Sequence, residues 1–171
     1  MKNAFLMLLL VLSLSTSFAQ NQSSSVRWRT IVGVITAPNV DNPVSSTSPI
    51  HSGTLPWTTN GGSARVNLST GAVTFKVDGL VLNGGDFSGT LPSGFPDVVG
   101  TLVCNAGTAT STTTLDTTPV TLDPEGDAFF SGHLLGVPPA ACANPLFLIR
   151  VPAFGGRWIA TGAVRTMNNN Y

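Results

Sequence analysis

Residues 63–82, SARVNLSTGAVTFKVDGLVL, alternate between apolar and polar side chains on both sides of a short turn. Successive side chains of a β-strand point to opposite faces, so each arm of this segment has one apolar face and one polar face. Gly71 in the turn can adopt the positive φ that short hairpin loops often need. The segment therefore predicts a β-hairpin whose apolar face must be covered by the rest of the chain.

The remaining sequence is divided by glycine, proline and asparagine turn signals into short segments of strand character, with no convincing helical period after the N-terminal segment. This pattern favours one all-β domain, an antiparallel β-sandwich of the immunoglobulin-like kind, with a β-barrel as the alternative. The further strands are expected at residues 26–36, 98–105, 108–118, 119–122, 128–137, 145–151 and 157–164.

Three of these segments carry more detailed expectations. Strict alternation in residues 26–36 places Trp28 and Val32 on one face and Ile31 on the other, with Arg27. Residues 145–151, PLFLIRV, are nearly all apolar, which predicts a strand buried on both faces. The threonine-rich residues 108–118 are expected to form an exposed edge strand, because threonine is a good strand former. An edge strand with few charges can pair with another chain, so this segment also predicts self-association.

The N-terminus has the pattern of a secretory signal peptide. Lys2 precedes an eleven-residue apolar run, and Ser17 and Ala19 are small residues at the positions that a signal peptidase reads. We expect a signal peptide over residues 1–19, with a retained membrane anchor as the alternative, a polar leader over 20–25, the folded domain over 26–166 and a flexible tail over 167–171. The mature chain would be secreted or periplasmic, and it contains no second apolar run of membrane-spanning length.

Charge argues against several classes of partner. Without the signal peptide, which contains Lys2 and no acid, the chain has seven Lys and Arg against eight Asp and Glu, and 7 − 8 gives a formal charge of −1. Charged residues make up 9% of the full chain, against about 25% in typical proteins. Nucleic acid is not an expected partner, and anionic membrane surfaces are disfavoured for the same reason.

The two cysteines, Cys104 and Cys142, are expected to form one disulfide, because an exported chain with two cysteines most simply pairs them. The two cysteines are 142 − 104 = 38 positions apart. Closing a loop of this length would stabilise the fold by roughly 4 kcal/mol in the chain-entropy model. The alternative is a metal-binding or catalytic thiol, but two ligands without a neighbouring histidine or second cysteine pair make a poor zinc site.

Three carboxylates occupy alternate positions in the segment DPEGD: Asp123, Glu125 and Asp127. Spaced carboxylates on a tight loop can supply the oxygen ligands that calcium prefers, so this turn is a candidate calcium site. It lacks the later bidentate acid of a calcium loop, and Pro-Glu-Gly-Asp is also an ordinary turn sequence. No other cofactor is expected.

Trp57 lies between a proline-rich loop and a turn, in LPWTTNGG, with Thr58 and Asn60 beside it. An exposed indole could stack on a sugar ring while the two polar side chains bind its hydroxyl groups. This predicts a carbohydrate-binding site at Trp57, Thr58 and Asn60. The alternative is a buried tryptophan that plugs one end of the domain, since large aromatic residues are usually mostly buried.

A catalytic site is not expected. The chain has two histidines, His51 and His133, and no G-x-S-x-G or H-E-x-x-H motif accompanies them. No Walker loop or G-x-G-x-x-G segment follows a predicted strand, which argues against a nucleotide cofactor. A small secreted hydrolase that uses His51 or His133 is the alternative.

Four segments together resemble a set of uncharacterised secreted bacterial β-sandwich proteins. The segments are residues 62–80, GTLVCN at 100–105, GDAFFSG at 126–132 and CANPLFLIR at 142–150. The hairpin is also faintly similar to the chordin-type extracellular β domain, but residues 83–86, NGGD, replace the histidine-containing motif of that family. The resemblance implies an exported β-sandwich and no catalytic residues.

Together, these patterns predict a non-catalytic exported binding or surface-structural module. Its partner would be an extracellular glycan or protein. Function would lie in the loops, mainly in residues 37–62 and 84–96, because loops on a rigid scaffold carry most binding residues.

Overall fold

The structure is a computed structural model that describes residues 25–37, 40, 42–45, 48–94, 97–108 and 111–168. The predicted signal peptide and most of the predicted leader lie outside these residues. The described chain contains eleven strands and two short 3₁₀ turns, η1 at Gly85–Phe87 and η2 at Pro152–Phe154. The strands are β1 Ser25–Gly33, β2 Trp57–Thr58, β3 Gly61–Asn67, β4 Ala72–Asp78, β5 Val81–Leu82, β6 Asp97–Cys104, β7 Thr113–Asp116, β8 Val120–Thr121, β9 Ala128–His133, β10 Leu146–Val151 and β11 Arg157–Asn168.

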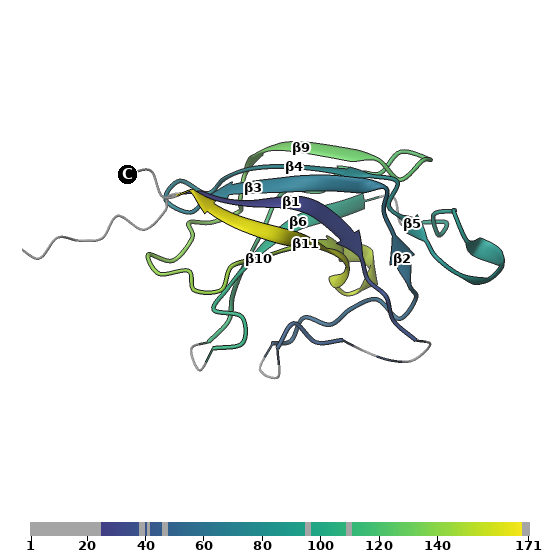
Figure 1. Cartoon of the computed structure of the whole chain (residues 1–171), viewed down its shortest axis with the longest axis horizontal. Helices are drawn as coiled ribbons and strands as arrows, with labels where there is room; N and C mark the ends of the chain where they lie inside the picture. Colours follow the sequence, from purple (N-terminus) through teal and green to yellow (C-terminus); the bar gives the residue numbers. More distant parts are fainter. Residues whose placement is uncertain are drawn as a thin grey trace, which may run out of the picture.

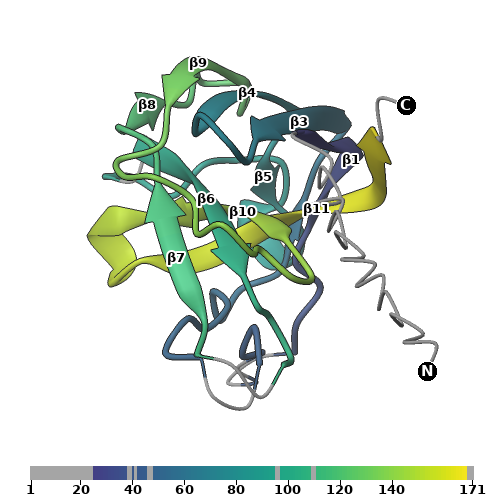
Figure 2. The ribbon, with the colours of Figure 1, turned by 90° about the vertical axis from the view of Figure 1, so that its left-hand side faces the viewer.

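Nine of the strands form one antiparallel sheet in the order β7-β6-β10-β11-β1-β3-β4-β9, with β8 paired to β6 beside β7. The sheet curls into a half-barrel, with β9, β4, β3 and β1 side by side along its upper part (Figure 1) and β6, β7 and β10 opposite them (Figure 2). The prediction of an all-β antiparallel fold is confirmed. The strands form one curled sheet, however, whereas a sandwich would have two separate sheets facing each other.

The predicted hairpin is β3 and β4, paired from Gly61 opposite Asp78 to Val66 opposite Val73. Its turn has the expected chemistry, because Gly71 has a φ of 73° and the Asn67 carboxamide oxygen accepts the backbone N–H groups of Ser69 and Thr70.

In β1, the predicted assignment of side chains to faces is wrong after Trp28. Trp28 is buried as expected, but Ile31 is 1% exposed and Val32 is 40% exposed. The alternation breaks where the pairing with β11 is irregular: Arg29 has no paired residue there, and Val164 of β11 has a φ of 51°. One residue is skipped on each strand, and beyond this point the side chains of β1 face the other way.

The sheet wraps around a core of aromatic side chains. The Phe147 ring lies 5.6 Å from the rings of both Trp28 and Phe75, measured between centroids. Two strand glycines make room for them. A Cβ at Gly100 would lie 2.7 Å from both Phe75 and Phe147, and one at Gly162 would lie 2.6 Å from Trp28.

The outer face of β6 and β10 is covered by the long loop between β1 and β2. A second, smaller cluster forms there from Ile50 of the loop, Val103, Ala106 and Leu148. The loop is anchored to β11 because the backbone N–H of Trp158 donates to the His51 carbonyl and its indole N–H donates to the Asn42 carbonyl. β10 is therefore covered on both faces, which confirms the prediction for residues 145–151.

Two boundary predictions are adjusted by the structure. β7 is the terminal strand of the sheet, which confirms an edge strand within residues 108–118, although the strand itself covers Thr113–Asp116. β11 extends to Asn168, two residues into the predicted flexible tail. In the described ranges, no helix has the length and apolar character needed to cross a membrane.

Candidate functional site

A small apolar pocket lies beside Trp57, next to the β2–β5 ribbon. Its volume is about 140 Å³. The residues that line it are Gly53, Thr54, Leu55, Trp57, Pro92, Phe154, Arg157 and Ile159.

Trp57 is held in this position by close backbone packing at the end of β1. Its backbone N–H donates to the carbonyl oxygen of Val34 at 2.8 Å. A Cβ at Gly33 would lie 2.2 Å from the Trp57 carbonyl oxygen, so only glycine lets the two segments approach this closely. The Trp57 side chain is 4% exposed and belongs to the main core. One wall of the pocket is therefore rigid.

The mouth of the pocket is formed by side chains that remain open to solvent. Leu55 is 51% exposed and Phe154, in η2, is 43% exposed. Arg157 is held nearby, because its guanidinium donates to the carbonyl oxygen of Ser52 at 2.6 Å. An apolar group that entered the pocket would cover Leu55 and Phe154 as well as the inner wall.

The Trp57 indole N–H gives the wall one polar feature. Among the residues that the structure describes, this N–H donates no hydrogen bond. It lies 3.6 Å from the position of a Cβ at Gly53, which is another residue of the pocket lining. The pocket therefore suits an apolar group that carries one hydrogen-bond acceptor.

The predicted sugar-binding residues are not brought together in this pocket. Trp57 lines it, but the residue is only 4% exposed, which leaves little of its ring open for a sugar to stack on. Thr58 and Asn60 are exposed and are not part of the lining. The Asn60 side chain packs over Gly79, where an added Cβ would lie 2.3 Å from its amide nitrogen.

The acidic turn, residues 123–127, joins β8 to β9 and so connects two different regions of the sheet. One carboxylate oxygen of Asp123 accepts the backbone N–H groups of Glu125 and Asp127, at 3.1 and 2.8 Å. Asp127 in turn accepts the backbone N–H of Gly79, just after β4, at 2.7 Å. Within the described ranges, no group of three or more His, Cys, Asp or Glu side chains is arranged to hold a metal ion. Calcium binding stays a prediction, and these hydrogen bonds favour a structural role for the turn.

Cys104 and Cys142 form the predicted disulfide. Cys104 is the last residue of β6, and Cys142 lies in the connection between β9 and β10. Both are buried, so the bond holds this connection against the core and exposes no thiol.

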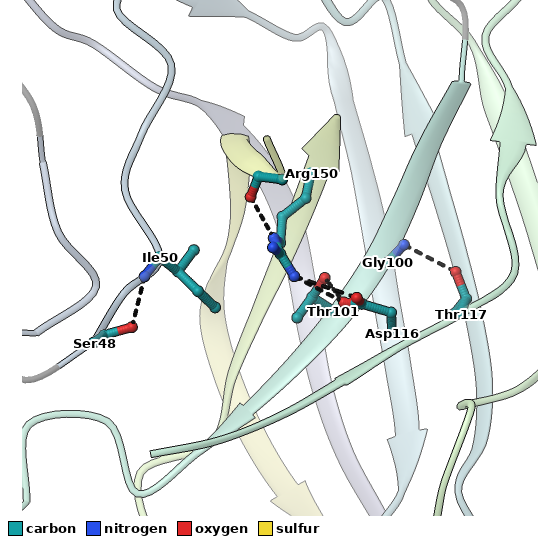
Figure 3. Close-up of polar contacts among 8 residues, drawn as sticks. Ser48, Ile50, Gly100, Thr101, Asp116, Thr117 and Arg150 are labelled. Carbon is teal, nitrogen blue, oxygen red and sulfur yellow. Dashed lines mark hydrogen bonds and ion pairs between the residues drawn. The ribbon is translucent and has the colours of Figure 1, made fainter. Parts of the chain in front are cut away.

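A polar network crosses the outer face of the sheet from β10 to β7 (Figure 3). Arg150 contacts both carboxylate oxygens of Asp116, at 3.0 and 3.3 Å, and donates from Nε to the Gly156 carbonyl. The hydroxyl of Thr101, a fully buried residue of β6, donates to the same carboxylate. The charged and polar groups of this network are hydrogen-bonded to one another, so the network links β10 to β7 across the intervening strand β6. The sequence gives no sign of this network, because its members lie far apart along the chain.

The two histidines occupy different environments. His133 is exposed on β9 and lines a shallow groove with Ser131 and Arg65. His51 lies in the loop that packs against β11. No described Asp or Glu is hydrogen-bonded to His133.

Sequence reasoning missed most of the apolar pocket. Its walls come from residues 53–57, from Pro92 and from residues 154–159, and no spacing rule connects these segments. The signal that the sequence does contain is local: Leu55 and Phe154 are large apolar residues in segments rich in proline and glycine.

Comparison with known proteins adds no relative. No protein-family model matches the chain, and neither does any curated protein or solved structure. The resemblances noted in the sequence therefore stay untested, and a proposal for function must come from the site itself.

Proposed function

We propose that this chain is a non-catalytic, exported binding module whose ligand inserts an apolar group into the pocket beside Trp57. The observation that carries the proposal is the combination of a rigid, buried wall at Trp57 and Ile159 with a solvent-exposed apolar mouth at Leu55 and Phe154. Ligand sites are typically concave and mostly apolar, with a few polar groups that orient the ligand.

The size of the pocket narrows the class of ligand. A cavity of roughly 150 Å³ can hold a benzene-sized molecule, and this pocket has a volume of about 140 Å³. A single aromatic ring or a branched alkyl group would fit. A hydroxyl, ether or carbonyl oxygen on that group would accept the hydrogen bond of the Trp57 indole. The rest of the ligand, whether small molecule or macromolecule, would lie outside the mouth.

Export is supported by the signal-peptide pattern of residues 1–19 and by the Cys104–Cys142 disulfide, because disulfides persist mainly in oxidising compartments. A non-catalytic role is supported by the environment of His133 and by the internal use of Arg150, Asp116 and Thr101 in the polar network. A sugar-stacking role for Trp57 is not favoured, because its ring is buried.

A thermal-shift screen tests the proposal. Phenol, cyclohexanol, indole and tert-butanol would be added to the purified protein, with glucose and glycine as polar controls. A ligand that binds only the folded state stabilises it by about 2.7 kcal/mol at a hundred times its Kd, which raises the melting temperature. We expect a rise with at least one apolar alcohol and none with the polar controls.

Two leucine variants test whether the ligand binds in the apolar pocket. Leu55→Ser removes apolar surface from the mouth and should reduce the ligand-induced shift at least threefold. Leu135→Ser is the matched control, because Leu135 is also exposed and lies outside the pocket lining. A shift that is unchanged in Leu55→Ser, or reduced equally in Leu135→Ser, would show that the ligand binds elsewhere.

A further inference from the structure

A row of exposed polar side chains crosses the outer face of four neighbouring strands. Arg27 of β1 lies opposite Arg65 of β3, which lies opposite Thr74 of β4, and Thr74 lies opposite Ser131 of β9. All four are exposed, whereas the adjacent row, with Val26, Val66 and Val73, is buried. Directly paired residues share a face of a sheet, so these four side chains project together into solvent on the outer face.

The pair Arg27–Arg65 is unfavourable for the protein alone. Like charges directly opposite each other on neighbouring strands destabilise a sheet. Within the described ranges, neither arginine forms an ion pair with a carboxylate, and the Arg65 guanidinium donates a long hydrogen bond of 3.4 Å to the Ser25 hydroxyl. Local features that cost stability without compensation are expected at functional sites.

Lys76, a nearby cation, differs from the two arginines because it has an anionic partner. Lys76 lies two residues from Thr74 on β4 and forms an ion pair with Asp78 at 2.6 Å. The hydrogen bond to Asp78 and the negative charge of this residue raise the pKa of Lys76 above its ordinary value. Lys76 therefore already has an anionic partner, whereas Arg27 and Arg65 present two uncompensated guanidinium groups.

A groove beside this row provides neutral hydrogen-bonding groups. It has a volume of about 460 Å³, and its lining includes Arg65, Asn67, Thr74, Ser131 and His133. A carboxamide, two hydroxyls and an imidazole thus lie next to a guanidinium on an open strand surface. Arginine binds carboxylate and sulfate groups well because its planar fork can donate two parallel hydrogen bonds.

We propose that this outer face of β1, β3, β4 and β9 binds an acidic polysaccharide. Arg27 and Arg65 would hold a carboxylate or sulfate group of the polymer, while Asn67, Thr74 and Ser131 bind neighbouring sugar hydroxyls. The chain has few cations and no net positive charge, which argues for a partner held by a few local contacts and against nucleic acid or an anionic membrane, because those surfaces need many cations for tight binding. This site is separate from the apolar pocket, and either can fail without the other.

Binding would be measured by isothermal titration of the purified protein with polygalacturonate, dextran sulfate and neutral dextran at low ionic strength. We expect binding to at least one acidic polymer and none to neutral dextran. Arg27→Gln and Arg65→Gln should each weaken binding at least fivefold. Arg165→Gln changes the net charge equally, but Arg165 donates to the Pro145 carbonyl beside β10, so this variant should bind like the wild type.

Thr74→Glu separates binding from folding. The new carboxylate would lie opposite Arg65, so we expect the melting temperature to rise while polymer binding is lost. Thr114→Glu on β7 is the matched control and should keep full binding. The proposal is overturned by no binding to either acidic polymer, by equal losses in Arg165→Gln or Thr114→Glu, or by tighter binding to anionic phosphatidylserine vesicles.

Discussion

The backbone N–H of Leu135 donates a hydrogen bond of 2.6 Å to the backbone carbonyl oxygen of Asp116. Asp116 ends β7, at one end of the strand order, and Leu135 closely follows β9, at the other end. The two ends of the curled sheet therefore meet near this hydrogen bond. This contact helps the single curled sheet (Figure 2) to surround the core without a second sheet facing it.

The first prediction concerns the space that Gly100 leaves for the aromatic core. Gly100→Ala would place a methyl group 2.7 Å from the rings of Phe75 and Phe147, which cannot both move away in a packed core. We expect a loss of about 1–3 kcal/mol in the free energy of unfolding, measured by urea denaturation. Thr114→Ala on the exposed β7 strand is the control and should change stability little. Equal stability of the two variants would contradict this description of the core.

Reduction of the disulfide should destabilise the protein strongly. The bond closes a segment of 38 residues, for which the chain-entropy model gives roughly 4 kcal/mol. We expect dithiothreitol to lower the melting temperature of the wild type substantially. The double variant Cys104→Ala, Cys142→Ala should melt at a similarly low temperature and be insensitive to dithiothreitol. A wild type that melts at the same temperature with and without reductant would show that the bond adds no stability.

The Asp123 carboxylate should stabilise the acidic turn through its hydrogen bonds, without a metal ion. Asp123→Ala removes the acceptor for two backbone N–H groups, and we expect it to cost about 1 kcal/mol because the turn is exposed. Glu125→Ala is the control, since Asp123 and Asp127, and not Glu125, accept the hydrogen bonds described for the turn. The melting temperature of the wild type should be the same with calcium and with a chelator. A calcium-dependent rise that Asp127→Ala abolishes would instead establish a metal site.

The outer edge of β7 should allow self-association at high concentration. Leu135 occupies this edge at Asp116, so the pairing would use the edge before Asp116, and edge strands with few charges can pair with a second chain. We expect sedimentation equilibrium to show a concentration-dependent dimer. Thr114→Lys should remove the dimer, because an edge lysine opposes strand pairing, whereas Thr121→Lys on β8 should not. A wild type that stays monomeric at millimolar concentration would rule this interface out.

Local patterns predicted the parts of this fold that depend on neighbouring residues. The alternation around Gly71 predicted the β3–β4 hairpin, and the cysteine count predicted the Cys104–Cys142 bond. The reversal of faces between Trp28 and Ile31 could not be predicted, because it depends on an irregularity in β11, more than a hundred residues away. The curled single sheet depends on such long-range pairings as well.

The candidate sites were predictable only in part, for the same reason. Trp57 stands out in the sequence, but its burial depends on Gly33 and Ile159, which belong to other strands. The row that contains Arg27 and Arg65 appears only when the register of β1 and β3 is known. In the sequence, each arginine is an ordinary exposed residue of a strand.

The indole N–H signals of the three tryptophans test the central claim most directly. They would be recorded by ¹H–¹⁵N correlation NMR while phenol or cyclohexanol is titrated in, and Trp→Phe variants would assign them. The apolar-pocket proposal predicts a saturable shift of the Trp57 indole signal, with the Trp28 and Trp158 signals unchanged, because Trp57 alone of the three lines the pocket. Saturable shifts at Trp158 or Trp28 without one at Trp57, or no saturable shift at all, would contradict it.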